Sequence, residues 1–206
     1  MFFNTLDRIR LISAKHSGKT YTPEALTKLI RSQFRDSALR FYTKKDARIA
    51  KHNILIGGEY VPHDDEDDEP CIHIHLTYST KDKIISIDKV DWGTLGFHIA
   101  NVITHEYIHR YHISKRNFKF GRSYKNDKIS KFETTMQDYL GCQDEIIAYG
   151  FNCAAEIVVY NLSFENTKTY ILYRKHFNED HQVLKKLKKQ TTQYLRQLKE
   201  ELYGQL

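Results

Sequence analysis

The segment His105-Glu106-Tyr107-Ile108-His109 places two imidazoles four positions apart, with a carboxylate directly after the first. On an α-helix, residues four apart lie about 40° from each other on one face, so both rings can reach one metal ion. Glu106 is turned about 100° from His105, which puts it beside such an ion rather than on it. There it can accept a proton from metal-bound water. The five residues therefore predict two zinc ligands and a general base.

The helix that positions this segment is expected to run from about Trp92 to His112, with Asp91 as its N-cap. His98 and His112 fall on the same stripe of that helix as the two histidines of the motif. Apolar side chains surround most of the rest of the helix, as in a helix buried in a core. They are Leu95, Ile99, Val102, Ile103 and Ile108. Buried polar groups are costly without partners, so the sequence favours a metal site over a coincidental histidine-rich face.

A catalytic zinc site usually has three protein ligands and a water molecule, so one ligand remains to be found. His112 lies about 10 Å along the axis from the first histidine, too far for a straight helix to bring both rings onto one ion. A second helical pattern runs from Gln143 to about Tyr160, and Glu145 near its start is the favoured third ligand. Asp144 and Glu156 are alternatives. Glu145 could also be a solvated carboxylate, favoured by the helix dipole.

Together, His105-Glu106-x-x-His109 and Glu145-x-x-Ala148 resemble the gluzincin branch of zinc metallopeptidases, over roughly residues 70–160. The resemblance implies His105, His109 and Glu145 as zinc ligands and Glu106 as the base that activates a zinc-bound water. It also implies a zincin-like fold and the hydrolysis of peptide bonds in a protein or peptide substrate. Small members, including ImmA/IrrE-like proteins, are similar to this chain in size.

The chain departs from that family in two ways. The 36-residue step from His109 to Glu145 is longer than usual, and the acidic residue that often follows the ligand glutamate is missing. The family's transition-state stabiliser, a His or Tyr, has no matching position here. Tyr149 and Tyr160 are the candidates that remain, and Tyr149 is also a candidate for substrate binding.

Three segments before the motif have the composition of β-strands: Asn53–Val61, Cys71–Ser79 and Ile84–Val90. In the second, apolar residues alternate with His73 and His75, so the two histidines share one face. In zincins, an edge strand beside the active-site helix holds the substrate by backbone pairing, and this second strand resembles that element in position. His73 and His75 are therefore predicted as surface or cleft residues that contact substrate, not as metal ligands.

The expected fold is α+β and zincin-like: a small twisted sheet packed on the active-site helix, with further C-terminal helices. One domain is expected over residues 1–206, with its core at about 50–162. Residues 22–38 are predicted as a helix that begins at Thr22 and Pro23. A long C-terminal helix with an apolar stripe is predicted at about 178–203.

Charge is unevenly distributed along the chain, whose net charge is +6. The acidic run 63–69 is interpreted as a solvated hairpin tip. The segment 115–131 interleaves basic and aromatic residues, which suits a solubilising loop, a lid over substrate or a nucleic-acid surface. A catalytically degenerate zinc module that binds nucleic acid or a protein through residues 115–131 is therefore the alternative to a peptidase. Hydrolysis of a non-peptide amide at the same zinc centre is a third possibility.

The remaining composition indicates a cytoplasmic protein. Cys71, Cys142 and Cys153 have no short paired spacing, so they are expected to be reduced thiols rather than disulfides or a structural zinc knuckle. The N-terminus is charged too early for a signal peptide, and no apolar run approaches the ~18 residues of a membrane span. No membrane insertion is expected.

Overall fold

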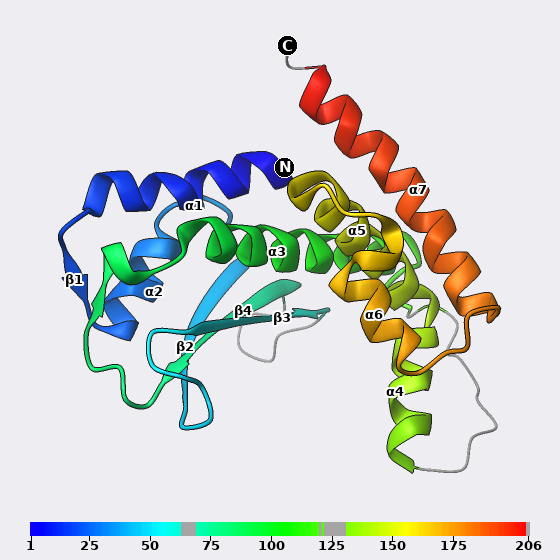
Figure 1. Ribbon diagram of the computed structural model, residues 1–206, viewed down its shortest axis with the longest axis horizontal. Helices are drawn as coiled ribbons and strands as arrows, with labels where there is room; N and C mark the ends of the chain where they lie inside the picture. Colours follow the sequence, from blue (N-terminus) through cyan, green and yellow to red (C-terminus); the bar gives the residue numbers. More distant parts are fainter. Residues whose placement is uncertain (63–68, 120, 122–130, 205–206) are drawn as a thin grey trace. The chain divides into compact units, whose positions relative to one another are not determined.

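The computed structural model describes residues 1–62, 69–119, 121 and 131–204 (Figure 1). It confirms the α+β class predicted from the sequence. The chain forms two compact units, Met1–Arg110 and Tyr111–Leu206. The acidic run other than Glu69, and residues 120 and 122–130 of the basic segment, lie outside the described residues. In the part of the chain that is described, no helix has the length and hydropathy needed to cross a membrane.

The first unit is built on a three-stranded sheet with the strand order β2-β4-β3. Strand β2 runs parallel to β4, whereas β3 runs antiparallel to it. Strands β1 and β5 form a separate antiparallel pair. In chain order, the elements are α1 (Phe2–His16), β1 (Thr20–Tyr21), α2 (Pro23–Arg31), β2 (Leu39–Asp46), β3 (Ile54–Val61), β4 (Cys71–Ser79), β5 (Ile85–Ser86), the 3-10 helix η1 (Ile87–Lys89) and α3 (Trp92–Lys115), which continues into the second unit.

The alternation in β4 separates the two faces of the sheet, as predicted. Ile72, Ile74, Leu76 and Tyr78 are fully buried and belong to one hydrophobic core with Ile99 and Ile103 of α3. His73 and His75 lie on the opposite face. One expectation is wrong: β4 is the middle strand, paired on both sides, and not an edge strand. The unpredicted strand β2 pairs with one side of β4 and leaves β3 at an edge of the described sheet.

Capping residues set the starts of the predicted helices. The Asp91 carboxylate accepts hydrogen bonds from the N–H and the hydroxyl of Thr94, at 3.0 and 2.7 Å, and so caps α3 as expected. The Thr22 hydroxyl caps α2 in the same way. However, α2 ends at Arg31 rather than near residue 38, because the Arg31 guanidinium donates to the carbonyls of Phe34 and Asp36 and closes the turn before β2.

The segment predicted as a third strand, Ile84–Val90, is mostly not a strand. Only Ile85–Ser86 pairs, as β5, and the chain then turns into η1. Ile85 and Ile87 are buried, so the apolar residues that suggested a strand do pack in the core. The short pairing with β1 gives them that burial without a long ladder of hydrogen bonds.

The second unit is helical in its described part. Its elements are α4 (Lys131–Gly141), α5 (Gln143–Tyr160), the 3-10 helix η2 (Phe164–Asn166), α6 (Lys168–Arg174) and α7 (Gln182–Tyr203). Helices α5 and α7 pack closely at Gly150, where an added Cβ would lie 2.5 Å from the Cβ of Gln190. The predicted apolar stripe of α7 is largely buried, at Val183, Leu184, Leu187 and Leu198. The helix begins at Gln182, four residues later than expected, because His181 is its N-cap.

Candidate metal centre

Helix α3 holds both histidines of the motif and the glutamate between them inside the first unit. His105, Glu106 and His109 are only 6 to 8% exposed. The Nε2 atoms of the two histidines lie 3.0 Å apart, and their ring centroids are 4.8 Å apart. Two nitrogens bound to one tetrahedral zinc ion at ~2.0–2.1 Å would lie about 3.3 Å from each other. The helical spacing therefore brings the rings to a separation suited to a shared ion.

The side chain of Glu106 lies against the edge strand β3 at Gly58. A Cβ added to Gly58 would lie 3.0 Å from Cγ of Glu106, 3.3 Å from its Oε1 and 2.5 Å from Cγ1 of Val102. The absence of a side chain at position 58 is thus what allows β3 to approach α3 so closely. This contact fixes where the Glu106 carboxylate can lie between the helix and the strand.

Tyr107, between the two histidines in sequence, faces another part of the first unit. Its hydroxyl donates a hydrogen bond to the Asp36 carboxylate, in the turn before β2. Burial and then the contact with Asp36 raise the pKa of Tyr107 well above its ordinary value. Burial alone would raise the pKa of Asp36, but hydrogen bonds from Tyr107 and the Ala38 N–H together lower it. This bond ties the rotation of α3 to the turn before β2.

Glu145 lies in the first turn of α5, in the second unit, near three tyrosines. Tyr149 packs edge-on against Tyr139 of α4 and Tyr173 of α6, with ring centroids 6.4 and 5.6 Å away. Burial first, and then Tyr149 and Glu145, raise the pKa values of Tyr139 and Tyr173 far above the ordinary value. These phenols therefore stay protonated at neutral pH and can donate hydrogen bonds. Sequence reasoning missed Tyr139 because it did not predict the helix α4.

The other two acidic candidates for a third ligand have protein partners of their own. Asp144 accepts hydrogen bonds from the Arg116 guanidinium at 2.6 Å and from the Gly121 N–H at 2.7 Å. Glu156 accepts from the hydroxyl of Thr169 at 2.6 Å and from backbone N–H groups at the start of α6. Both carboxylates are buried and engaged in holding the second unit together. Asp144 and Glu156 therefore already have a structural role in the second unit.

His73 and His75 do not lie on the side of the sheet that packs on α3. They point away from the core and form a group with Glu59 of β3. The sheet lies between these histidines and the Glu106 carboxylate. The structure therefore does not bring the predicted substrate-binding residues His73 and His75 together with the motif on α3. The edge strand that does touch the helix is β3, and no signal in its sequence other than Gly57-Gly58 indicated this.

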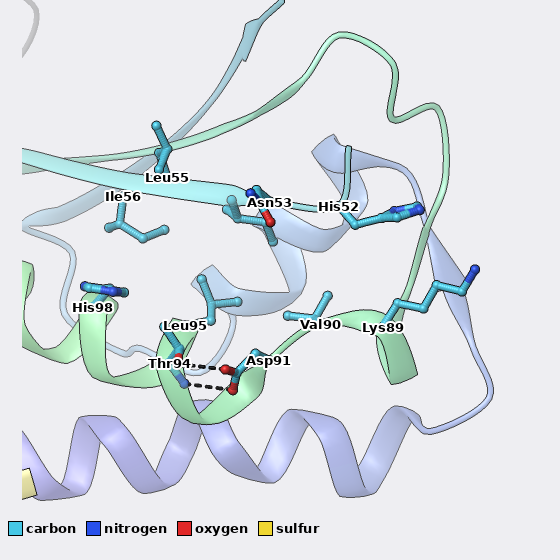
Figure 2. Close-up of a pocket in the computed structure, with 11 residues that line it drawn as sticks. His52, Asn53, Leu55, Ile56, Lys89, Val90, Asp91, Thr94, Leu95 and His98 are labelled. Atoms are coloured by element: carbon cyan, nitrogen blue, oxygen red, sulfur yellow. Dashed lines mark hydrogen bonds between the residues drawn. The ribbon is translucent and has the colours of Figure 1, made fainter. Parts of the chain in front are cut away.

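A pocket of about 430 Å³ lies between the beginning of β3 and the first turns of α3 (Figure 2). Ile54, Ile56 and Leu95 give it an apolar lining. His98, two turns before His105 on α3, lies at one end, and the hydrogen-bonded pair Asp91–Thr94 at the base of the helix also lines it. The strand β3 thus runs from this pocket to the contact with Glu106.

No protein-family model, curated protein or solved structure matches this chain. The function must therefore be inferred from the chain's own residues and their geometry.

Proposed function

We propose that this protein is a zinc metallopeptidase with a zincin-like fold, in which His105, His109 and Glu145 hold the metal. The observation that carries the proposal is that α3 holds the Nε2 atoms of His105 and His109 3.0 Å apart, with Glu106 buried on the same helix. Two imidazole nitrogens and one carboxylate are a common donor set for catalytic zinc, and they leave one position for water. Glu145 is proposed as the third ligand from its place in the first turn of α5, with the small residue Ala148 three positions later.

The end of α3 is linked to the start of α5 inside the second unit. Helix α3 is continuous from Trp92 to Lys115, so it carries both histidines to within three turns of its end. Arg116, directly after that helix, holds Asp144 at 2.6 Å, and Asp144 directly precedes Glu145. This ion pair, which is largely buried at Asp144, keeps the start of α5 close to the end of α3.

In this proposal, Glu106 is the general base of peptide hydrolysis. A bound zinc ion would polarise the scissile carbonyl and lower the pKa of a water molecule. Glu106 accepts the proton of that water and passes it to the leaving amine. Its packing against Gly58 holds the carboxylate in place, which limits the reorganisation that proton transfer requires. Tyr139, whose pKa burial raises far above its ordinary value, and its neighbour Tyr149 are candidates for the hydrogen-bond donor that stabilises the transition state.

The substrate peptide is proposed to pair with the free edge of β3. Extended peptides add to exposed sheet edges through backbone hydrogen bonds, while side chains enter pockets beside the strand. Along β3, Ile54 and Ile56 border the pocket, and Gly58 borders Glu106. A peptide on this strand would therefore run from the pocket to the base. The apolar lining favours an apolar substrate side chain a few residues away from the scissile bond.

Replacement of Glu106 by glutamine tests the proposal. The amide keeps the shape of the side chain but cannot accept the proton, so Glu106→Gln should retain zinc and lose hydrolysis by about 100-fold or more. Zinc is measured by elemental analysis, and hydrolysis by mass spectrometry of a mixed peptide library. Exposed Glu165, replaced in the same way, is the matched control. His109→Ala and Glu145→Ala should lose the metal. Equal hydrolysis by Glu106→Gln and the control would reject Glu106 as the base.

A further inference from the structure

Three side chains converge on the face of the sheet that points away from the core. Glu59 of β3 and His73 and His75 of β4 each offer a ligand atom within 4.8 Å of the others. Oε1 of Glu59 lies 3.0 Å from Nε2 of His75 and 3.7 Å from Nδ1 of His73. This group lies entirely within the first unit and shares no residue with the candidate metal centre on α3.

The register of the sheet produces this convergence. His73 and His75 are two positions apart on one strand, so their side chains emerge on the same face. Glu59 lies directly opposite His73 in the antiparallel pair, and it is the diagonal neighbour of His75. All three side chains therefore emerge from paired strand backbone, which is more rigid than a loop. Ligands on such elements are held in position before an ion binds.

We propose that Glu59, His73 and His75 form a second metal site, for a late first-row divalent cation such as zinc. Two imidazole nitrogens and one carboxylate suit zinc or copper, whereas calcium and magnesium prefer oxygen ligands alone. Ligand atoms around one tetrahedral ion are expected about 3.3 Å apart, and the two measured separations lie on either side of that value. A small rotation of the Glu59 side chain would equalise them.

The surroundings of the histidines suit a metal site. The nitrogen of His73 that faces away from Glu59, Nε2, lies 3.2 Å from the sulfur of Cys71 and 3.5 Å from the hydroxyl of Tyr42. Such contacts to the second nitrogen orient a histidine ligand and fix its tautomer. The Tyr42 ring also packs against both imidazoles, with centroids 4.9 and 5.4 Å away.

The exposure of the ligands sets the character of the site. The side chains of His73 and His75 are 18 and 17% exposed, whereas that of Glu59 is 59% exposed. An ion here would be held from below by the histidines and remain open to water on the Glu59 side. Such a site exchanges its metal more readily than a buried one. We therefore expect weaker binding here than at a closed three-ligand centre.

Metal titration of the 206-residue chain tests the second site. The first measurement uses His109→Ala, in which the centre on α3 is disabled, and titrates it with zinc by calorimetry. One equivalent should bind. Replacing both His73 and His75 by alanine in that background should weaken binding at least about tenfold. The matched control is His16→Ala, because His16 contacts Tyr21 and lies outside the group. Unchanged binding after the double replacement, or no binding to His109→Ala, would overturn the proposal.

The stoichiometry of the otherwise unaltered chain separates this proposal from the proposed function. If both sites exist, elemental analysis after zinc loading and gel filtration should give two equivalents, and one after replacement of His73 and His75. One equivalent that is lost with His73 and His75 would support the second site alone. One equivalent that is lost only with His109 would refute it and leave the α3 centre intact.

Discussion

Replacing Gly58 by alanine should destabilise the first unit by forcing β3 away from α3. The added Cβ would lie 2.5 Å from Cγ1 of Val102 and 3.0 Å from Cγ of Glu106. Carbon atoms in ordinary contact are about 3.5–4.0 Å apart, so the overlap with Val102 is about 1 Å. Valine is β-branched and has little freedom to rotate aside. The strand must therefore shift, or Val102 must leave its preferred rotamer.

The magnitude follows from two opposing contributions to the free energy of unfolding. Overpacking of this kind costs about 1–3 kcal/mol. Exchanging glycine for alanine restricts the unfolded chain and stabilises by about 0.4–1 kcal/mol where the native backbone tolerates it. Gly57 is the matched control, because nothing lies within 4 Å of a Cβ added there. Both variants share the second contribution, so the difference between them should be the steric cost alone, about 1–3 kcal/mol.

Urea unfolding followed by tryptophan fluorescence measures that difference directly. Trp92, the only tryptophan, is buried at the start of α3 and reports on the first unit. Gly58→Ala should unfold at a lower urea concentration than Gly57→Ala, with a similar slope. Because the same contact positions Glu106, Gly58→Ala should also slow hydrolysis in the zinc-loaded protein. Coincident unfolding curves for the two variants would refute the close packing of β3 on α3.

Three further predictions concern caps and buried groups. Asp91→Ala should lower the free energy of unfolding by about 1 kcal/mol in urea at pH 7. The Thr94 N–H lowers the pKa of Asp91 from 3.8. The destabilisation caused by Asp91→Ala should therefore be complete above about pH 4 and vanish as the pH falls through the lowered pKa. A destabilisation that does not change with pH would contradict this prediction. Burial raises the pKa of Cys153 to about 12. In native protein at pH 8, iodoacetamide should therefore label partly exposed Cys142 and spare Cys153, which mass spectrometry can show. Equal labelling of the two cysteines would be inconsistent with the burial of Cys153. Glu156→Ala leaves buried donors at the start of α6 without an acceptor, so it should lower the free energy of unfolding by about 1–3 kcal/mol. The zinc content should not change. Loss of zinc in this variant would restore Glu156 as a candidate ligand.

The elements that the sequence predicted well are those whose pattern is local. Helix α3 has a capping residue and apolar side chains around it, and β4 alternates between buried and partly exposed residues from Ile72 to Tyr78. Strand β2 was missed because its outer end, Lys44-Lys45-Asp46, is charged and only Leu39 is buried. Such a composition suits an edge strand in solvent, and it resembles a loop in the sequence. Without β2, nothing indicated that β4 lies in the middle of the sheet.

Helix α1 was missed for a different reason. Its buried residues Phe2, Leu6, Ile9 and Ile12 recur at helical spacing, so the signal is present in the sequence. The charged residues between them excluded a signal peptide but did not lead to a helix prediction. Helix α6, of 7 residues, is too short to give a periodic pattern, and its start depends on the remote acceptor Glu156.

The candidate sites divide in the same way. The approach of His105 and His109 to 3.0 Å follows from one helix, so its geometry could be predicted from spacing. The placement of Glu59 beside His73 and His75 depends on the β3–β4 register. That register is a property of the strand pair and cannot be predicted from the sequence of either strand alone. The sequence therefore placed the two histidines on one face but gave them no acidic partner. Tyr139, on an unpredicted helix, likewise had no position relative to Glu145.

The register of β3 links the two candidate metal sites through opposite faces of one strand. Gly58 faces Glu106, and the next residue, Glu59, faces the histidines of β4. A slip of one residue would exchange the two faces and remove Glu59 from the histidines. The glycines cannot prevent such a slip, because Gly57 would fit against α3 as well as Gly58. The inward side chains do prevent it: Ile54, Ile56 and Tyr60 pack on the core, and a slip would replace them with Leu55 and Glu59. The carboxylate of Glu59 would then enter the core near Glu106, so apolar packing on one face fixes the ligand geometry on the other.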